Sequence, residues 1–166
     1  MEMEDLCNIR GISSQCKDDR HVLFWDFDHI SMRNYDKLID NIKETQELYH
    51  LSDVYFFETL HGYHGICLDK YSLDDAYRIY CNLDFADKKH RKWGYSKWKH
   101  WVLRVSIDKD IKFLYPIRSR YNQKLKSNAH RVFFNLAYNM DIKHDLFFDQ
   151  TESVFLEWWK KYDTVV

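Results

Sequence analysis

The run HVLFWDFDHI at residues 21–30 constrains the fold of this chain most strongly. Four apolar residues, Val22 to Trp25, lead into Asp26-Phe27-Asp28, and a short apolar run of this kind predicts a buried central strand that ends in carboxylates. Side chains alternate along a strand, so Asp26 and Asp28 should point to the same face. Two adjacent carboxylates repel each other unless a cation lies between them. The run therefore predicts a metal-binding pair; the plainer alternative is one helix-capping Asp and one exposed Asp.

The hydrophobic periodicity along the chain predicts an α+β fold. Apolar residues recur at helical spacing over 34–50, where Asn34 is the expected N-cap, and Ser72 should cap a second helix. Pro116 places its strand at an edge of the sheet. The expected elements are strands at 21–30, 53–60, 63–68, 100–107 and 111–117, and helices at 34–50, from 72, at 125–140 and at 150–162. Residues 84–100 are expected to form a loop with a helical turn.

This order is β-α-β-β-α-β, the RRM-like or ferredoxin-like arrangement, with an extra C-terminal strand and helices. Helices should cover one face of an antiparallel sheet, which leaves the other face for a ligand or a second layer. Residues 1–20 are polar and patternless and are expected to form an N-terminal arm. Residues 21–166 then form a single domain, in line with a length of 166 residues.

Composition narrows the function classes. No apolar stretch approaches the length of a membrane span, and the acidic N-terminus does not resemble a signal peptide, so we expect a cytoplasmic protein with no membrane partner. The four cysteines lack a repeated close spacing, which is typical of a reducing compartment. The formal net charge is −1, but the aromatic share is 17%, more than a small core needs.

Three further residue groups point to nucleotide chemistry. The turn His61-Gly62-Tyr63-His64-Gly65 can bring backbone and imidazole donors close to a phosphate; a plain glycine turn is the alternative. Asp108 and Asp110 follow the strand that ends near residue 107, and Asp108 is the candidate third metal carboxylate, although Asp-Lys-Asp is also a common solvated turn. Arg104, on the same strand, could meet a triphosphate or a surface acid.

Two stretches combine cations with aromatic rings. Residues 88–104 hold seven Lys or Arg interleaved with Trp and Tyr, and a second stretch follows at 118–131. Cations follow a phosphate backbone and rings stack on bases, so both stretches are predicted to contact nucleic acid; a solvated charged loop is the alternative. The candidate contacts are Lys92, Trp93, Lys97, Trp98, Lys99, Arg118 and Arg120.

Taken together, these motifs resemble the archaeo-eukaryotic primase superfamily, the primase-polymerases. That family has a DxD motif on one strand, a small-x-His motif on another and a later Asp, which are matched by Asp26-Phe27-Asp28, Gly62-Tyr63-His64 and Asp108. The resemblance covers about residues 20–118, departs from the family in having Gly62 where Ser is common, and leaves no room for a helicase domain. A compact or divergent member, for example one from a virus or plasmid, would have this form.

The resemblance implies a nucleotidyltransferase acting in replication on a DNA or RNA template. Asp26, Asp28 and Asp108 would hold Mg²⁺ or Mn²⁺, while His64, Gly62, Tyr63 and Arg104 would bind a nucleoside triphosphate. Two alternatives stay open. One is an inactive nucleic-acid-binding protein on the same fold. The other is a metal-dependent phosphohydrolase or nuclease, because the first strand is also similar to that of haloacid-dehalogenase phosphatases and NYN-type ribonucleases, which have parallel sheets.

Overall fold

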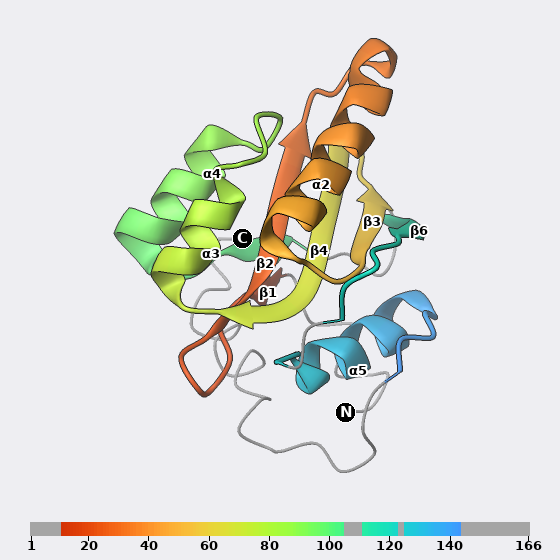
Figure 1. Cartoon of the computed structure of the whole chain (residues 1–166). Coiled ribbons are helices and arrows are strands. Elements are labelled where there is room, and N and C mark those ends of the chain that lie inside the picture. Colours follow the sequence, from red (N-terminus) through yellow and green to blue (C-terminus); the bar gives the residue numbers. More distant parts are fainter. Residues whose placement is uncertain (1–10, 105–110, 123–124, 144–166) are drawn as a thin grey trace.

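The strand β4 (Gly62–Tyr71) lies inside a four-stranded antiparallel sheet in the computed structural model, which describes residues 11–104, 111–122 and 125–143 (Figure 1). On one side it pairs with β2 (His21–Asp28), and on the other with β3 (Val54–Glu58). The strand β6 (Lys112–Ile117) pairs with the outer side of β3, which gives the order β2-β4-β3-β6. Every strand pairing among the described residues is antiparallel, and with four helices the protein is α+β, as predicted.

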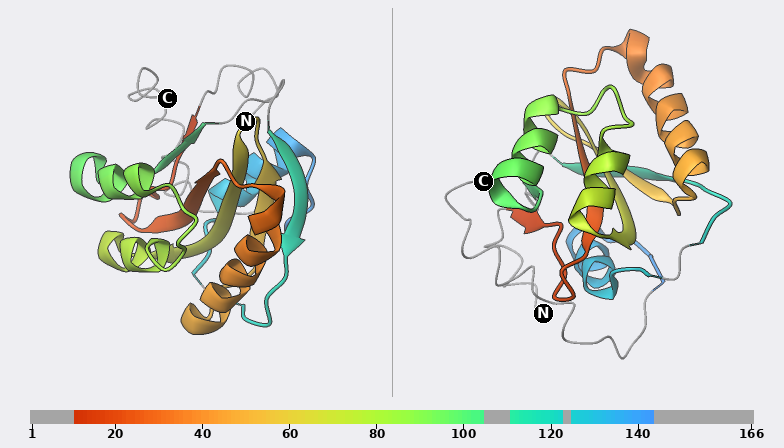
Figure 2. Two further views of the ribbon diagram at one scale, coloured as in Figure 1. Left: turned by 90° about the horizontal axis from the view of Figure 1, so that it is seen from above. Right: turned by 60° about the vertical axis from the view of Figure 1, so that its left-hand side comes forward.

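Helices cover both faces of this sheet (Figure 2). The short turn η1 (Met32–Asn34) leads into α2 (Tyr35–Tyr49), and α3 (Leu73–Tyr80) follows β4; both lie on one face. The helix α5 (Asn128–Tyr138) lies on the other. Neighbouring residues of β3 show the division, because Phe56 contacts Tyr35 of α2 whereas Phe57 contacts Phe134 of α5. The face predicted to hold a ligand or a second layer is therefore partly covered by α5.

Local sequence explains where the helices begin. The Ser72 hydroxyl accepts a hydrogen bond from the Asp75 amide, which caps α3 as the sequence predicted. Asn34 occupies the N-cap position of α2, but its side chain makes no capping hydrogen bond. Leu38 and Ile42 of α2 are buried at helical spacing, so this helix is held by its apolar stripe rather than by its cap.

Part of the predicted N-terminal arm is built into the core. Residues Gly11–Ser13 form the buried strand β1, which pairs with β5 (Val102–Arg104) in a separate two-stranded sheet. The expectation of an arm is therefore wrong for residues 11–16, which are almost entirely buried. The strand β5 is the fourth strand of the predicted order, and in the described residues it pairs with β1 and not with β2.

Buried histidines explain why this polar-looking segment can be buried. His100 Nδ1 is hydrogen-bonded to Ser13 Oγ at 2.8 Å, and His130 Nε2 lies 2.8 Å from the Ser13 carbonyl oxygen. His21 Nδ1 lies 3.0 Å from Ser14 Oγ. Burying polar groups is tolerable when each finds such a partner. A hydropathy pattern does not reveal these pairings, because each one joins residues that look polar on their own.

Residues 88–98 are helical along their whole length, where the sequence predicted only a loop with a turn. The helix α4 (Lys88–Trp93) runs directly into the π-helical turn η2 (Gly94–Trp98). The Asp87 carboxylate caps α4 by accepting from the His90 amide at 2.7 Å. Gly94 sits against the buried ring of Trp101, and a Cβ at this glycine would lie 2.2 Å from Trp101 Cδ1. This close contact fixes α4 to the core.

The buried histidines predict an acid-sensitive fold. Burial lowers the pKa of His21, His100 and His130 to about 4 each. The unfolded chain titrates near its ordinary value, so it binds more protons than the folded chain between those values, and stability must fall as pH falls through that window. Urea unfolding at pH 7 and pH 5 should show a loss of about 2 kcal/mol or more.

The exposed His61 provides the control for that measurement. A His61→Gln variant should keep the same pH dependence as the original protein, whereas His130→Gln should reduce it. A free energy of unfolding that stays flat between pH 7 and pH 5 would contradict the assignment of neutral buried imidazoles.

Candidate metal and nucleotide site

The antiparallel register of β2 and β4 brings the predicted site residues together. Asp26 lies directly opposite His64, and Asp28 lies opposite Gly62. His64 Nε2 is 3.5 Å from Asp26 Oδ1, as expected from the predicted adjacency of the two strands. Because Asp26, Asp28 and His64 occupy alternating or directly paired positions, all three belong to the same face of the sheet. This is the face on which α5 packs, since Phe24 of β2 contacts His130.

The two carboxylates of the pair differ in their electrostatic surroundings. Burial alone would raise the pKa of Asp26, but the hydrogen bond and charge of His64, with a smaller contribution from His90, lower it overall. The pKa of Asp28 is raised, first by burial and then by the negative charges of Asp26 and Asp87. The Asp26 side chain keeps 24% of its surface exposed. The pair therefore presents accessible, mutually repelling negative charge, which a divalent cation would relieve.

Gly62 has a structural reason to be glycine. A Cβ at this position would lie 1.8 Å from the backbone oxygen of Phe27, so β2 approaches the start of β4 more closely than any side chain permits. The glycine expected to contact a nucleotide thus also sets the spacing between the two strands that carry Asp28 and His64.

A third carboxylate near the pair is Asp87, which sequence reasoning missed. Its amide donates to the Asp26 carbonyl oxygen at 2.7 Å, and its charge contributes to the raised pKa of Asp28. The only sequence signal was its position before the helix of residues 88–98. The predicted third ligand, Asp108, lies outside the described residues, as does Asp110. Within the described ranges, no group of three His, Cys, Asp or Glu has metal-binding geometry.

One predicted nucleotide contact, Tyr63, does not share a face of the sheet with the carboxylate pair. Tyr63 precedes His64 on β4 and points to the opposite face, where its ring stacks on Phe56 at 4.9 Å and contacts Tyr35 of α2. Neighbouring strand residues alternate between faces, so Tyr63 lies on the face opposite His64, and its contact with a nucleotide stays a prediction. The backbone of Arg104 pairs with Gly11, and its side chain lies outside the described part.

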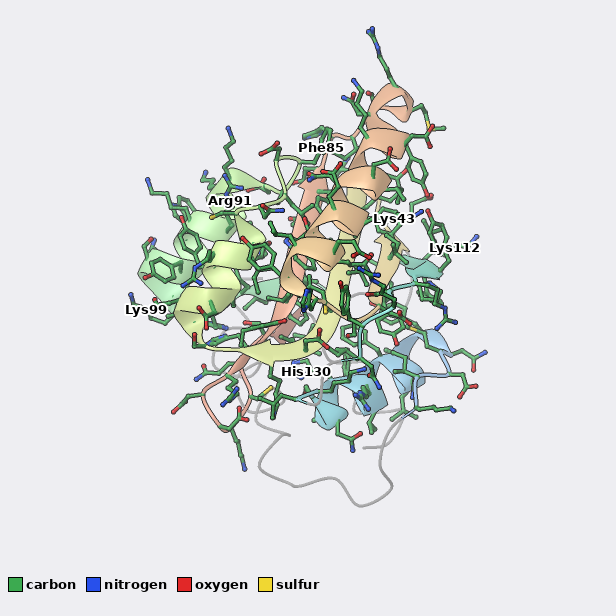
Figure 3. The ribbon with its side chains drawn as sticks, viewed as in Figure 1. Lys43, Phe85, Arg91, Lys99, Lys112 and His130 are labelled. Carbon is green, nitrogen blue, oxygen red and sulfur yellow. The ribbon has the colours of Figure 1, made fainter. Side chains whose placement is uncertain are left out.

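The helical segment 88–98 presents the predicted basic and aromatic side chains on its surface. Lys89 and Lys97 place their Nζ atoms 4.5 and 5.2 Å from the ring centroid of Trp93. Trp93 is exposed and Trp98 partly so, while Lys92, Lys97 and Lys99 are exposed. Figure 3 shows Arg91 and Lys99 on the side of the molecule where α4 lies. We call Lys92, Trp93, Lys97, Trp98 and Lys99 the α4 surface. Trp101, by contrast, stacks on Tyr80 inside the core.

Arg118 and Arg120 lie on a different part of the protein, after β6. Arg118 forms an ion pair with Asp53 at 2.9 Å, and Arg120 pairs with Glu47 at 2.8 Å. Both guanidinium groups remain largely exposed, at 77% and 72% of the side-chain surface. Such exposed pairs are weak and can exchange for a phosphate partner.

No family model matches the chain, and searches of curated proteins and of solved structures give no significant match. Among the described residues, no helix has both the length and the apolar character needed to cross a membrane. Function must therefore be argued from the geometry of the site.

Removing one charge of the carboxylate pair should stabilise the metal-free protein. Asp28→Asn removes a carboxylate whose pKa is raised first by burial and then by the negative charges of Asp26 and Asp87. A raised carboxyl pKa means that the charged form disfavours the fold as pH rises through that value. In the presence of EDTA at pH 7, thermal unfolding should show a gain, of about 0.5 kcal/mol or less because solvent screens the exposed group. If Asp28→Asn gave the same gain in unfolding free energy at a pH low enough to protonate Asp28, the charge of Asp28 could not be the cause.

Filling the space at Gly62 should disrupt the strand pairing. Gly62→Ala forces the β2 and β4 backbones apart and should destabilise the protein by about 2 kcal/mol or more in urea unfolding. Gly65→Ala is the matched control, because its Cβ would meet side chains and no backbone, with Phe27 at 3.2 Å, Val54 at 3.4 Å and Trp25 at 3.5 Å. Equal stability losses in the two variants would rule out a special close approach at Gly62.

Proposed function

We propose that this protein is a metal-dependent nucleotidyltransferase of the primase-polymerase kind, acting on a nucleic-acid template. The observation that carries the proposal is the register of β2 and β4, which sets His64 opposite Asp26 on the face that also bears Asp28. The resemblance of the DxD and Gly-x-His motifs to the primase superfamily supports the same function. So does the order β2-β4-β3 with α2 as the connection, which we interpret as part of an RRM-like core.

In this proposal Asp26 and Asp28 hold Mg²⁺ or Mn²⁺. The donor set suits these hard cations, because both residues offer carboxylate oxygens and Asp28 carries charge that its neighbours disfavour. When bound, the ions would neutralise the triphosphate and favour ionisation of a primer 3′-hydroxyl. His64 lies beside Asp26 and can donate an N–H to a phosphate oxygen. The 3′-hydroxyl would lose its proton to solvent water, its oxygen would bond to the α-phosphorus, and the bond from the α-phosphorus to the bridging oxygen would break, so that pyrophosphate leaves.

The α4 surface would hold the template strand. Its lysines and exposed rings combine the two interactions that single-stranded nucleic acid offers, with phosphates and with base faces. The Asp87 cap ties the start of α4 to the β2 edge, because the Asp87 amide binds the Asp26 carbonyl oxygen. A strand on this helix would thus lie near the carboxylate pair.

The alternatives draw unequal support. Phosphatases and ribonucleases of the haloacid-dehalogenase and NYN types need parallel sheets, and all pairings in the described residues are antiparallel. A binding protein without catalysis keeps a specific observation in its favour: the α4 surface is complete within the described residues, whereas a third metal ligand is not.

A primer-extension assay with labelled nucleotides and Mg²⁺ or Mn²⁺ tests the proposal. Extension should occur with the original protein and fall at least about 100-fold in Asp26→Asn and in Asp28→Asn. Asp36→Asn, at an exposed position of α2, is the control that should retain full activity. Absence of product, together with strand binding that survives Asp26→Asn and Asp28→Asn, would replace this proposal with the binding-protein reading. Shortened substrate would point to nuclease activity.

A further inference from the structure

A cleft of about 790 Å³ lies between the loop after β6 and the first half of α5, away from the carboxylate pair. Tyr55 of β3, Leu68 of β4 and Asn128 of α5 are among the residues that line it. Its lining is strongly cationic, although the whole chain has a formal charge of −1. The charged lining residues are the cations Arg118, Arg120, Lys126, Arg131 and Lys143 and the acids Asp53 and Asp141.

One of the two acids is already neutralised inside the cleft wall. The Asp53 carboxylate accepts from Arg118 Nη1 at 2.9 Å and from the Ser119 amide at 2.8 Å. The Asp53 carboxylate therefore holds the loop of Arg118 and Ser119 in place, and its negative charge is balanced by Arg118. Arg120 is matched in the same way by Glu47, which lies outside the lining. Setting both pairs aside, the lining still has three cations against one acid, Asp141, so the charge of the cleft favours an anion.

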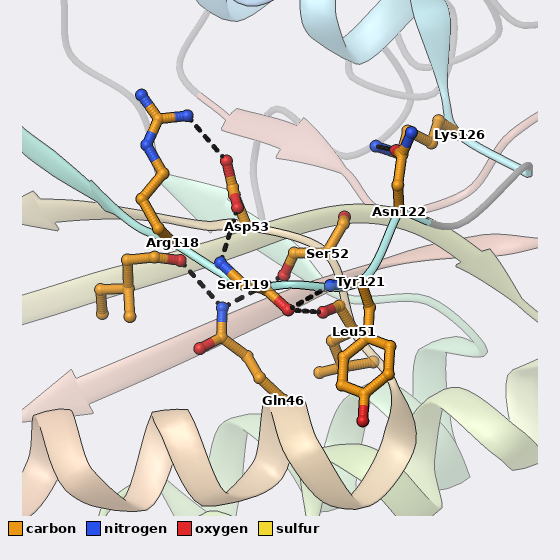
Figure 4. A network of polar contacts seen from close by, with 10 residues as sticks. Gln46, Leu51, Ser52, Asp53, Arg118, Ser119, Tyr121, Asn122 and Lys126 are labelled. Atoms are coloured by element: carbon orange, nitrogen blue, oxygen red, sulfur yellow. Dashed lines mark hydrogen bonds and ion pairs between the residues drawn. The ribbon is translucent and has the colours of Figure 1, made fainter.

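The wall of the cleft is held in place by a polar network (Figure 4). Gln46 of α2 donates to the carbonyl oxygens of Ile117 at 2.8 Å and of Ser52 at 3.2 Å. The Ser119 hydroxyl donates to the Leu51 carbonyl oxygen at 2.5 Å and accepts from the Tyr121 amide at 3.1 Å. These bonds fix the loop that carries Arg118 and Arg120 before any ligand arrives.

The floor of the cleft adds an aromatic hydroxyl. Tyr55 is half-buried there, and burial together with the charge of Asp53 raises the pKa of Tyr55 to about 12, so its hydroxyl keeps its proton at neutral pH. A protonated hydroxyl can donate to a phosphate oxygen. At the rim, the Tyr121 ring stacks on His50 with centroids 4.3 Å apart, and the Arg120 guanidinium carbon lies 5.0 Å from the Tyr121 ring centroid.

The cleft and the carboxylate pair belong to the same face of the sheet. Tyr55 lies opposite Ile66, two residues along β4 from His64, so the side chains of Tyr55 and His64 point to the same side. Phe57, which is covered by Phe134 and Tyr138 of α5, stands opposite His64 on β3. A ligand long enough to pass beside α5 would reach both places.

From these observations we propose that the cleft binds a phosphate-bearing nucleotide unit. The unit can come from a free nucleotide or from a nucleic-acid strand, and both offer the same phosphate and base chemistry. The choice of a nucleotide over another anion rests on the proposed function. The volume of the cleft lies within the range of ordinary small-ligand sites.

Fluorescence anisotropy of a labelled oligothymidylate, measured in EDTA over a range of salt concentrations, tests this site without catalysis. The double variant Arg120→Gln/Lys126→Gln removes two cleft cations and should weaken binding about tenfold or more and reduce the salt slope by about two. Lys37→Gln/Lys43→Gln removes the same charge from exposed positions of α2 and should bind like the original protein; Figure 3 shows Lys43 there. Thermal unfolding of both variants checks that they are folded.

Titration calorimetry with ATP distinguishes a free nucleotide from a nucleic-acid strand as the ligand of the cleft. Binding of ATP that is lost in the Arg120→Gln/Lys126→Gln variant supports a free nucleotide. Binding of the oligonucleotide, but not of ATP, that is weakened in the same variant supports a strand. Equal affinity of the two double variants for both ligands would overturn the proposal. Asp26→Asn should leave binding in EDTA unchanged, so a loss of extension activity there and a loss of binding here report on different sites.

Discussion

The pairing of β2 with β4 is the interaction on which the rest of the structure depends. It aligns Asp26 with His64, it brings the Phe27 backbone against Gly62, and it sets the alternation that sends Trp25 toward α3 and Phe24 toward α5. The hydrophobic pattern of the two strands fixes this register, because a shift of one residue would move every buried side chain to the opposite face. The chemistry proposed for the carboxylate pair is therefore a direct product of how two strands meet.

Much of the sheet was predictable from periodicity alone. The strand before Asp26, the helix after Asn34 and the hairpin that turns before Gly62 each leave a local pattern. The pairing of β3 with β4 follows from their short connection, and the pairing of β2 with β4 is what the predicted β-α-β-β order implies. The adjacency of Asp26 and His64 follows in turn. The same alternation predicts Tyr63 on the face opposite His64, and its ring contacts Tyr35 of α2 there.

The remaining features depend on long-range pairings that no local pattern encodes. The burial of Ser13 depends on His100 and on His130, far along the chain. The role of Asp87 depends on the loop that returns to the free edge of β2. The cleft beside α5 gathers cations from the loop after β6, from α5 and from the residues after α5, and only folding shows that Arg118 and Lys143 share one lining. The sequence shows the basic stretch 118–131, but it does not show that this stretch lines a cleft together with Lys143.

The network around Gln46 has a consequence for kinetics. One amide group joins the end of α2 to the carbonyl oxygens on either side of the cleft wall, so the wall has little freedom to rearrange. Because the cleft wall is already formed, a charged ligand can bind without a slow conformational step. Long-range electrostatic attraction then sets the association rate constant. For such a surface, salt acts mainly on the association rate, while the lifetime of the complex is set by the short contacts made after docking.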